Sequence, residues 1–191
     1  MPSSFRPAPP PGLAIIAMGV SGSGKSTLGA LLAAKLGCPF LEGDDFHDAG
    51  AVAKMRAGQP LDDDDRWPWL DRLGRAVGQA VTTGRPVVAA CSALRRSYRE
   101  RLRGAIAVPT RFVLLDASHD ELVRRLTQRS GHYMPISLLD SQLATLEPPG
   151  DDEAIFRLNA VASPERLCEA VQAWLDGDAR WNESQAHALG H

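Results

Sequence analysis

The stretch Gly19-Val20-Ser21-Gly22-Ser23-Gly24-Lys25-Ser26 determines the fold of this chain of 191 residues. It matches the phosphate-binding loop motif GxxxxGK[ST] in full. The apolar run 13–18 precedes it, and leucines at helical spacing follow it up to Gly37. The motif therefore has the strand–loop–helix context that it requires, and we expect a phosphate-binding loop (P-loop) rather than a chance glycine-rich turn.

The chemistry of a P-loop assigns a role to each part of the motif. Its glycines let consecutive backbone N–H groups turn toward phosphate oxygens at the positive end of the following helix. We expect the loop, with Thr27 after it, to bind the phosphates of a nucleoside triphosphate. Lys25 would reach the β- and γ-phosphates, and Ser26 would ligate Mg²⁺.

Composition places the chain among ordinary globular proteins, with 44% hydrophobic and 23% charged residues and a net charge of -2. This balance gives no electrostatic reason to expect nucleic acid or an anionic membrane as the main partner. No apolar run approaches the roughly 20 residues that span a bilayer. Three scattered cysteines, without metal-ligand spacing, indicate reduced thiols in a cytoplasmic protein: Cys38, Cys91 and Cys168.

The order of elements predicts one α/β domain over residues 13–177. The predicted strands cover 13–18, 39–42, 86–91, 111–115 and, more weakly, 154–158. The predicted helices follow the P-loop and cover 50–57, 66–83, 95–103, 118–129, 138–146 and 163–175. Such alternation is typical of a parallel sheet with its ligands at the carboxyl ends of the strands. Residues 1–12 are expected to be a disordered Pro-rich segment, and 178–191 a polar tail.

An acidic cluster follows the second predicted strand, at Glu42-Gly43-Asp44-Asp45-Phe46-His47. An acid here would lie near the γ-phosphate and could accept a hydrogen bond from an attacking hydroxyl, so Asp44 is the candidate base. The alternative for Asp44 is a helix cap or a solvated turn. His47 is a candidate substrate contact, with a structural role equally open.

A second acidic run, Asp62-Asp63-Asp64-Asp65, precedes Arg66. We expect Asp62 and Asp63 to lie in a solvated loop or helix start. Arg66 could bind a carboxylate through two parallel hydrogen bonds. Trp69 could line the pocket or pack in the core.

A basic segment follows the third predicted strand. Arg95, Arg99 and Arg103 share one helix face. A solvated basic face accounts for Arg99 to Arg103, whereas Ser92, Arg95 and Arg96 at the strand–helix junction are expected to meet an anionic substrate.

Two arginines one helical turn apart, Arg125 and Arg129, lead into a segment interrupted by glycines and prolines. This pattern suggests a mobile lid over about 125–147 that brings positive charge to a transferring phosphoryl group and excludes water. An ordinary exposed helix end is the alternative.

Other P-loop classes fit less well. A guanine-reading NKxD motif is missing from the sequence, and the DxxG at Asp71 to Gly74 falls inside a predicted helix. The third strand ends in Cys91-Ser92 rather than in the acid of many ATPases, and Asp116 is only a weak substitute.

Taken together, the motifs resemble the gluconokinase family. The matching stretches are GVSGSGKS, GDxxH ending at His47, KMxxGxPLxDxDRxPWL from Lys54, CSALRRxYRxxLR from Cys91, RxGHxM from Arg129 and SQLxxLExP from Ser141. They extend over about residues 13–175. A likeness confined to the P-loop would admit shikimate kinase or adenylylsulfate kinase equally well.

The resemblance implies ATP-dependent phosphorylation of D-gluconate at its 6-hydroxyl. It implies a P-loop fold like that of nucleoside monophosphate kinases, with sheet order 2-3-1-4-5, helices on both faces, a helical lid and a homodimer. Catalysis would use Lys25, Asp44, Arg125 and Arg129, and the candidate gluconate or phosphate contacts are Asp44, His47, Lys54, Arg66, Arg95, His132 and Gln142. A kinase for another polyhydroxy acid or sugar, or a non-catalytic ATP-binding regulatory module, remains open.

Overall fold

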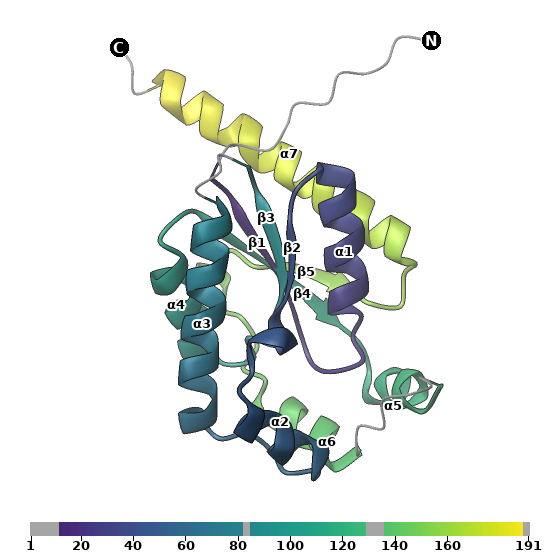
Figure 1. The fold of residues 1–191 in the computed structure, drawn as a ribbon. Helices are drawn as coiled ribbons and strands as arrows, with labels where there is room; N and C mark the ends of the chain where they lie inside the picture. Colours follow the sequence, from purple (N-terminus) through teal and green to yellow (C-terminus); the bar gives the residue numbers. More distant parts are fainter. Residues whose placement is uncertain (1–11, 82–84, 129–135, 189–191) are drawn as a thin grey trace.

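The computed structural model describes residues 12–81, 85–128 and 136–188, with side chains up to residue 177 apart from those of 136 and 137 (Figure 1). A five-stranded sheet with strand order β2-β3-β1-β4-β5 forms its centre. All four strand pairs are parallel, which confirms the predicted fold and order. The strands are β1 (Ala14–Met18), β2 (Phe40–Glu42), β3 (Val87–Ala90), β4 (Thr110–Asp116) and β5 (Phe156–Asn159).

Helices follow the strands in the predicted alternation. They are α1 (Lys25–Leu36), α2 (Ala49–Arg56), α3 (Asp63–Val81), α4 (Arg96–Ile106), α5 (His119–Gln128), α6 (Ile136–Thr145) and α7 (Pro164–Ala188), with two 3₁₀ turns, η1 (Gly43–Phe46) and η2 (Asp151–Glu153).

Two helix boundaries differ from the prediction. Helix α3 begins three residues before the expected start at 66, because the Asp62 carboxylate accepts a hydrogen bond from the Asp65 N–H at 3.0 Å and caps the helix. Helix α7 continues to Ala188, past the expected end near Leu175. Residues 178–188 contain no proline, and the single Gly177 costs only about 1 kcal/mol in a helix.

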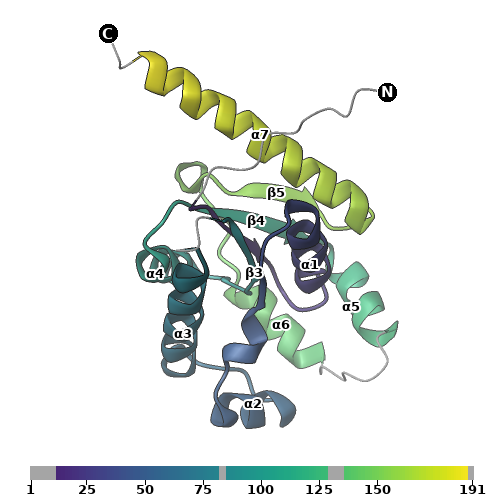
Figure 2. The same cartoon turned by 45° about the horizontal axis from the view of Figure 1, so that its top comes forward.

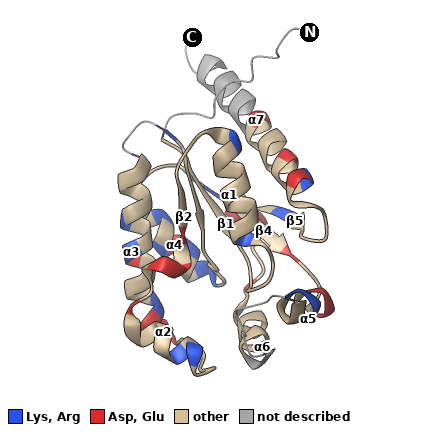
Figure 3. Ribbon diagram, turned by 45° about the vertical axis from the view of Figure 1, so that its right-hand side comes forward, with Lys and Arg blue, Asp and Glu red and all other residues tan. Residues whose placement is uncertain are grey.

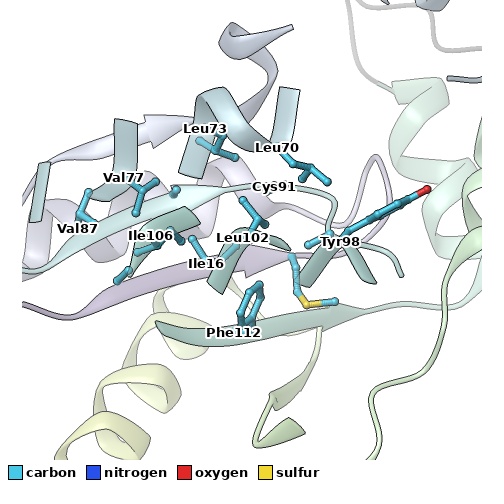
Figure 4. Packing of buried hydrophobic residues seen from close by; sticks show 14 of the residues in the cluster. Ile16, Leu70, Leu73, Val77, Val87, Cys91, Tyr98, Leu102, Ile106 and Phe112 are labelled. Atoms are coloured by element: carbon cyan, nitrogen blue, oxygen red, sulfur yellow. The ribbon is translucent and has the colours of Figure 1, made fainter. Parts of the chain in front are cut away.

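Two helical layers cover the sheet, one on each face (Figure 2). Helices α3 and α4 pack on alternate strand residues such as Ile16, Val87 and Phe112, and Figure 4 shows this cluster from close by. Helices α1 and α7 pack on the opposite set, which includes Ile15 and Val88. The inner strands β1 and β3 are therefore continuous apolar runs, because both of their faces are buried.

A smaller apolar cluster lies behind the P-loop. Val20 from the loop packs with Leu122 and Leu126 from α5, Leu94 from the segment after β3 and Leu139 from α6. Leu122 and Leu139 are completely buried. Helices α5 and α6 are thereby fixed against the loop in this structure.

Arg99 corrects the expectation of a solvated basic face on α4. Its side chain is completely buried and forms two hydrogen bonds with the Glu153 carboxylate, at 2.6 and 2.7 Å. Its guanidinium also donates to the carbonyl oxygens of Leu94 and Glu147, at 3.1 and 3.3 Å. The pair therefore joins α4 to the end of β3 and to the segment that follows α6.

The cysteines are free, as predicted. Cys91 and Cys168 are buried, and burial raises the pKa of the Cys91 thiol to about 12. No helix within the described ranges is both long and apolar enough to cross a membrane.

Replacing Glu153 with Gln should destabilise the fold by about 3 kcal/mol, because the Arg99 charge would stay buried without its counter-charge. Urea denaturation of E153Q at neutral pH would measure this loss. Glu169→Gln, at an exposed position of α7, is the matched control and should change little.

The ion pair of Arg99 and Glu153 should also make the free energy of unfolding depend on pH. Arg99 holds the pKa of Glu153 below its ordinary value. The stabilisation is therefore complete above the ordinary glutamate pKa of about 4.3 and is lost as the pH falls through the lowered value. The difference in the free energy of unfolding between wild type and E153Q should shrink over that acid range. A difference that stays constant with pH would contradict the stabilising role of the ionised Glu153.

Candidate active site

The P-loop occupies the end of the central strand β1 and has the backbone shape of an anion cradle. Gly19, Gly22 and Gly24 have φ values of 138°, 80° and 100°, in the left-handed region that favours glycine. A Cβ at Gly19 would lie 2.7 Å from the Leu115 carbonyl oxygen, so no larger residue fits there. The Ser23 hydroxyl is buried and has no hydrogen-bond partner among the described residues.

The residues predicted to meet phosphate and metal begin α1. Lys25 donates a hydrogen bond to the Val20 carbonyl at 2.9 Å and thus lies across the loop. Ser26 and Thr27 are exposed in the first helical turn, which has no acidic residue that would repel an anion. Among the described residues, no group of three His, Cys, Asp or Glu has the geometry to hold a metal ion. A magnesium ion at the P-loop would be held by Ser26 and phosphate oxygens. The loop therefore fits Mg²⁺ and a triphosphate.

Gln142 contacts the P-loop itself. Its side-chain oxygen accepts a hydrogen bond from the Ser21 N–H at 2.7 Å. Ser21 belongs to the loop and Gln142 to α6, so this contact adds a polar link to the apolar cluster behind the loop. The structure places Gln142 on the nucleotide side, beside the residues that would hold phosphate.

Arg125 also contacts the P-loop. It donates to the Ser23 carbonyl at 3.2 Å and to the Ala160 carbonyl at 2.5 Å, and it pairs with Glu121 at 2.6 Å. The side chain therefore bridges the loop and the segment between β5 and α7. The other two predicted residues of this region, Arg129 and His132, lie outside the described residues.

On the other side of β1, the turn η1 carries Asp44. The Asp44 side chain is 83% exposed, and its Oδ1 lies 4.0 Å from Nε2 of His47. His47 is buried, with its Nδ1 unpartnered among the described residues, and it stacks on Trp69 with ring centroids 4.3 Å apart. The Trp69 indole N–H donates to the Gly43 carbonyl at 2.7 Å, so Trp69 supports the turn from below.

The charges around His47 show which groups lie near it. Burial lowers the pKa of His47, Asp44 raises it, and the positive charges of Arg72 and Arg66 lower it again. His47 is therefore neutral at neutral pH. Arg66 stands one helical turn before Trp69, which stacks on His47, so Arg66 and Asp44 both belong to the surroundings of this imidazole.

Arg66 and Arg95 meet at Tyr98. Arg66 donates to the Tyr98 oxygen at 3.3 Å, while Arg95 donates to both oxygens of Asp63 at 3.1 and 2.9 Å. Tyr98 itself donates to Asp63. Asp63 is the first residue of α3, as expected of a helix start, and its half-exposed carboxylate is also the ion-pair partner of Arg95, which the sequence did not indicate.

Lys54 is held by the same acidic run. Its Nζ lies 2.7 Å from both oxygens of Asp65 and 3.8 Å from Asp62. Figure 3 shows acidic and basic residues interleaved around η1, α2 and the start of α3. Asp63 and Tyr98 were not predicted from the sequence to join Arg66 and Arg95 in one cluster. Their presence in the matching motifs DxDR and CSALRRxY was the signal that could have indicated it.

Comparisons with known proteins identify the family of this chain. A family described as AAA domain matches residues 15–149. A gluconokinase of Gluconobacter oxydans is 50% identical over 157 residues, which cover 82% of this chain and 88% of that protein. The chain belongs to the gluconokinase family. The thermosensitive gluconokinase of Escherichia coli is 40% identical over 149 residues, with 78% of this chain and 79% of that protein covered.

Solved structures extend the family likeness to the fold. A gluconokinase from Sinorhizobium meliloti superposes with a TM-score of 0.79 at 40% identity and covers 94% of this chain and 99% of that chain. A shikimate kinase from Aquifex aeolicus, with a TM-score of 0.55 at 17% identity over 87% of this chain and 98% of that chain, shares the fold alone. Gluconokinase family members are P-loop kinases that use ATP with Mg²⁺.

The Asp44 turn should be intolerant of a methyl group at its first residue. A Cβ at Gly43 would lie 2.2 Å from the Ala90 carbonyl oxygen, so Gly43→Ala must displace η1 or the end of β3. We expect a loss of about 2 kcal/mol in the free energy of unfolding, measured by chemical denaturation. Gly104→Ala on α4, where nothing lies within 4 Å, is the control and should stabilise by about 0.5 kcal/mol. Equal effects at the two positions would contradict the close approach.

Proposed function

We propose that this protein transfers the γ-phosphoryl group of ATP to the 6-hydroxyl of D-gluconate, giving 6-phospho-D-gluconate and ADP. Named gluconokinases at 40–50% identity support the acceptor. The observation that carries the proposal is the arrangement of two groups at His47, on the sheet edge that also holds the P-loop. The Asp44 carboxylate lies 4.0 Å from His47, and Arg66 stands one helical turn before Trp69, whose ring stacks on His47. A protein that only bound nucleotide would need no such acceptor side.

Catalysis in this proposal depends on positioning and on electrostatic stabilisation. The P-loop N–H groups and Lys25 hold the triphosphate, and Ser26 ligates Mg²⁺. When bound, the magnesium ion offsets the negative charge of the phosphate oxygens. Asp44 accepts the hydrogen bond of the attacking hydroxyl and orients it in line with the phosphoryl group.

Further charges complete the proposed site. Arg66 binds the gluconate carboxylate through its planar fork. Arg125 and Arg129 contribute positive charge on the nucleotide side, and the segment 125–147 acts as a lid. His47, Lys54, His132 and Gln142 are proposed to contact or to orient substrate, and Arg95 is proposed to orient it through its ion pair with Asp63.

An acceptor panel tests the substrate. With MgATP, ADP release coupled to a spectroscopic assay should be much faster with gluconate than with shikimate, glycerate or glucose. Shikimate and glycerate carry a carboxylate but differ from gluconate in length, and glucose lacks the carboxylate. The panel therefore tests the need for a carboxylate and the need for the length of gluconate separately. Comparable rates on all four acceptors, or no turnover, would refute the proposal.

Asp44→Asn should lower kcat about a hundredfold or more while leaving the affinity for ATP nearly unchanged, because only the orientation of the acceptor hydroxyl is lost. Steady-state kinetics together with calorimetry of nucleotide binding would separate the two effects. Asp45→Asn, at the exposed neighbouring position, is the matched control. A collapse of ATP affinity would instead assign Asp44 to the metal site.

Two broader properties are also part of this proposal. The three free cysteines support a cytoplasmic location. The homodimer is proposed from the family resemblance, and sedimentation equilibrium tests it.

A further inference from the structure

Tyr98 holds two arginines side by side at the acceptor end of α4. Its ring closes the apolar cluster, and its hydroxyl points away from the aliphatic side chains (Figure 4). The guanidinium carbons of Arg66 and Arg95 lie 5.3 and 5.6 Å from the ring centroid, within the range of a cation–π interaction. Two positive charges are thus fixed on one aromatic ring.

Asp63 contacts Arg95 directly and is linked to Arg66 through the Tyr98 hydroxyl, so it neutralises the charge of Arg95 alone. Its carboxylate accepts two hydrogen bonds from Arg95, at 2.9 and 3.1 Å, and one from the Tyr98 hydroxyl. The hydroxyl is thereby oriented so that its oxygen accepts the hydrogen bond from Arg66. Within the described residues, no carboxylate lies within ion-pair distance of Arg66. The three charged groups therefore sum to one positive charge, and it lies on Arg66.

The cluster is accessible to a small solute. The side chains of Arg95 and Asp63 are 39% and 43% exposed. Arg66 stands one helical turn before Trp69 on α3, and the Trp69 ring stacks on His47 of the Asp44 turn. The uncompensated charge therefore lies on the helix face that supports this turn, where the acceptor hydroxyl is proposed to be oriented.

We propose that Asp63 is a specificity-determining residue that limits the acceptor to one carboxylate. It occupies Arg95 and, through Tyr98, orients Arg66, so that a single guanidinium remains to bind an anion. A second anionic group on the substrate would need the charge of Arg95, which Asp63 already holds, and would meet the Asp63 carboxylate instead. This inference rests on the proposed function, because it explains how a monocarboxylic acceptor is selected over compact dianions.

The test compares two small anions as competitive inhibitors against gluconate at saturating MgATP. Acetate carries one carboxylate, and malonate carries two within a short chain. In Asp63→Asn, Arg95 becomes available, and the ratio of the malonate to the acetate inhibition constant should fall about fivefold, the factor expected from a half-exposed ion pair. Asp64→Asn, an exposed acid on the same helical turn, should leave the ratio unchanged.

Further variants separate charge from structure. Arg95→Gln leaves the Asp63 charge unopposed and should raise the ratio about fivefold, by the same ion-pair argument. The double variant D63N/R95Q should return it to the wild-type value. Tyr98→Phe keeps the Asp63–Arg95 pair and should raise the gluconate KM without moving the ratio. A purely structural role for Asp63 would not produce opposite shifts in D63N and R95Q.

An unchanged ratio in D63N and in R95Q would overturn the inference. If D63N does not fold, R95Q alone still tests the inference, because the ratio of the malonate to the acetate inhibition constant should rise in this variant. Failure of the proposed function is a separate outcome, in which the wild type does not phosphorylate gluconate. The two anions would then be compared by calorimetry on the protein saturated with MgADP, where the same ratios apply.

Discussion

Three strand ends converge on Gly19, and the rest of the site depends on this convergence. Strand β1 pairs with β3 on one side and with β4 on the other. At its end, the Gly19 N–H donates to the Ser92 carbonyl at 3.3 Å, and the Gly19 Cα approaches the Leu115 carbonyl so closely that a side chain is excluded. The P-loop therefore begins at a point where it touches both neighbouring strand exits. Residues of the acceptor side follow β2 and β3, and residues of the nucleotide side follow β4 and β5.

The parts of the fold that local chemistry specifies were predictable. Strands β1, β3 and β4 contain apolar runs next to Gly, Pro or a charged residue. The P-loop motif determines both its own conformation and its flanking elements. The order of the strands came from the family resemblance, and the structure confirms it. Helix ends were less predictable, because four consecutive acids offer several N-caps for α3 and only the structure shows that Asp62 is the one used.

Long-range pairing of charges could not be read from the sequence. Arg99 and Glu153 are separated by 54 positions, and a basic helix face gives no sign that one of its arginines is buried. Asp63 lies among four consecutive acids, a composition that favours solvent, yet it is the partner of Arg95. Only folding brings α3 beside α4 and so gives Asp63 and Tyr98 their roles. The predicted candidates Asp44, His47, Arg66 and Arg95 nevertheless gather at one edge of the sheet.

The thiol of Cys91 lies at that edge, directly after β3, and its burial bears on how the protein meets oxidants. Only the thiolate reacts readily with peroxides and disulfides. Burial raises the pKa of the Cys91 thiol to about 12, so the unreactive thiol form predominates at neutral pH. The side chain is also only 2% exposed. The strand that supports the acceptor site thus contains a sulfur atom that stays reduced without a protecting disulfide, so the geometry of the site is insulated from the redox state of its surroundings.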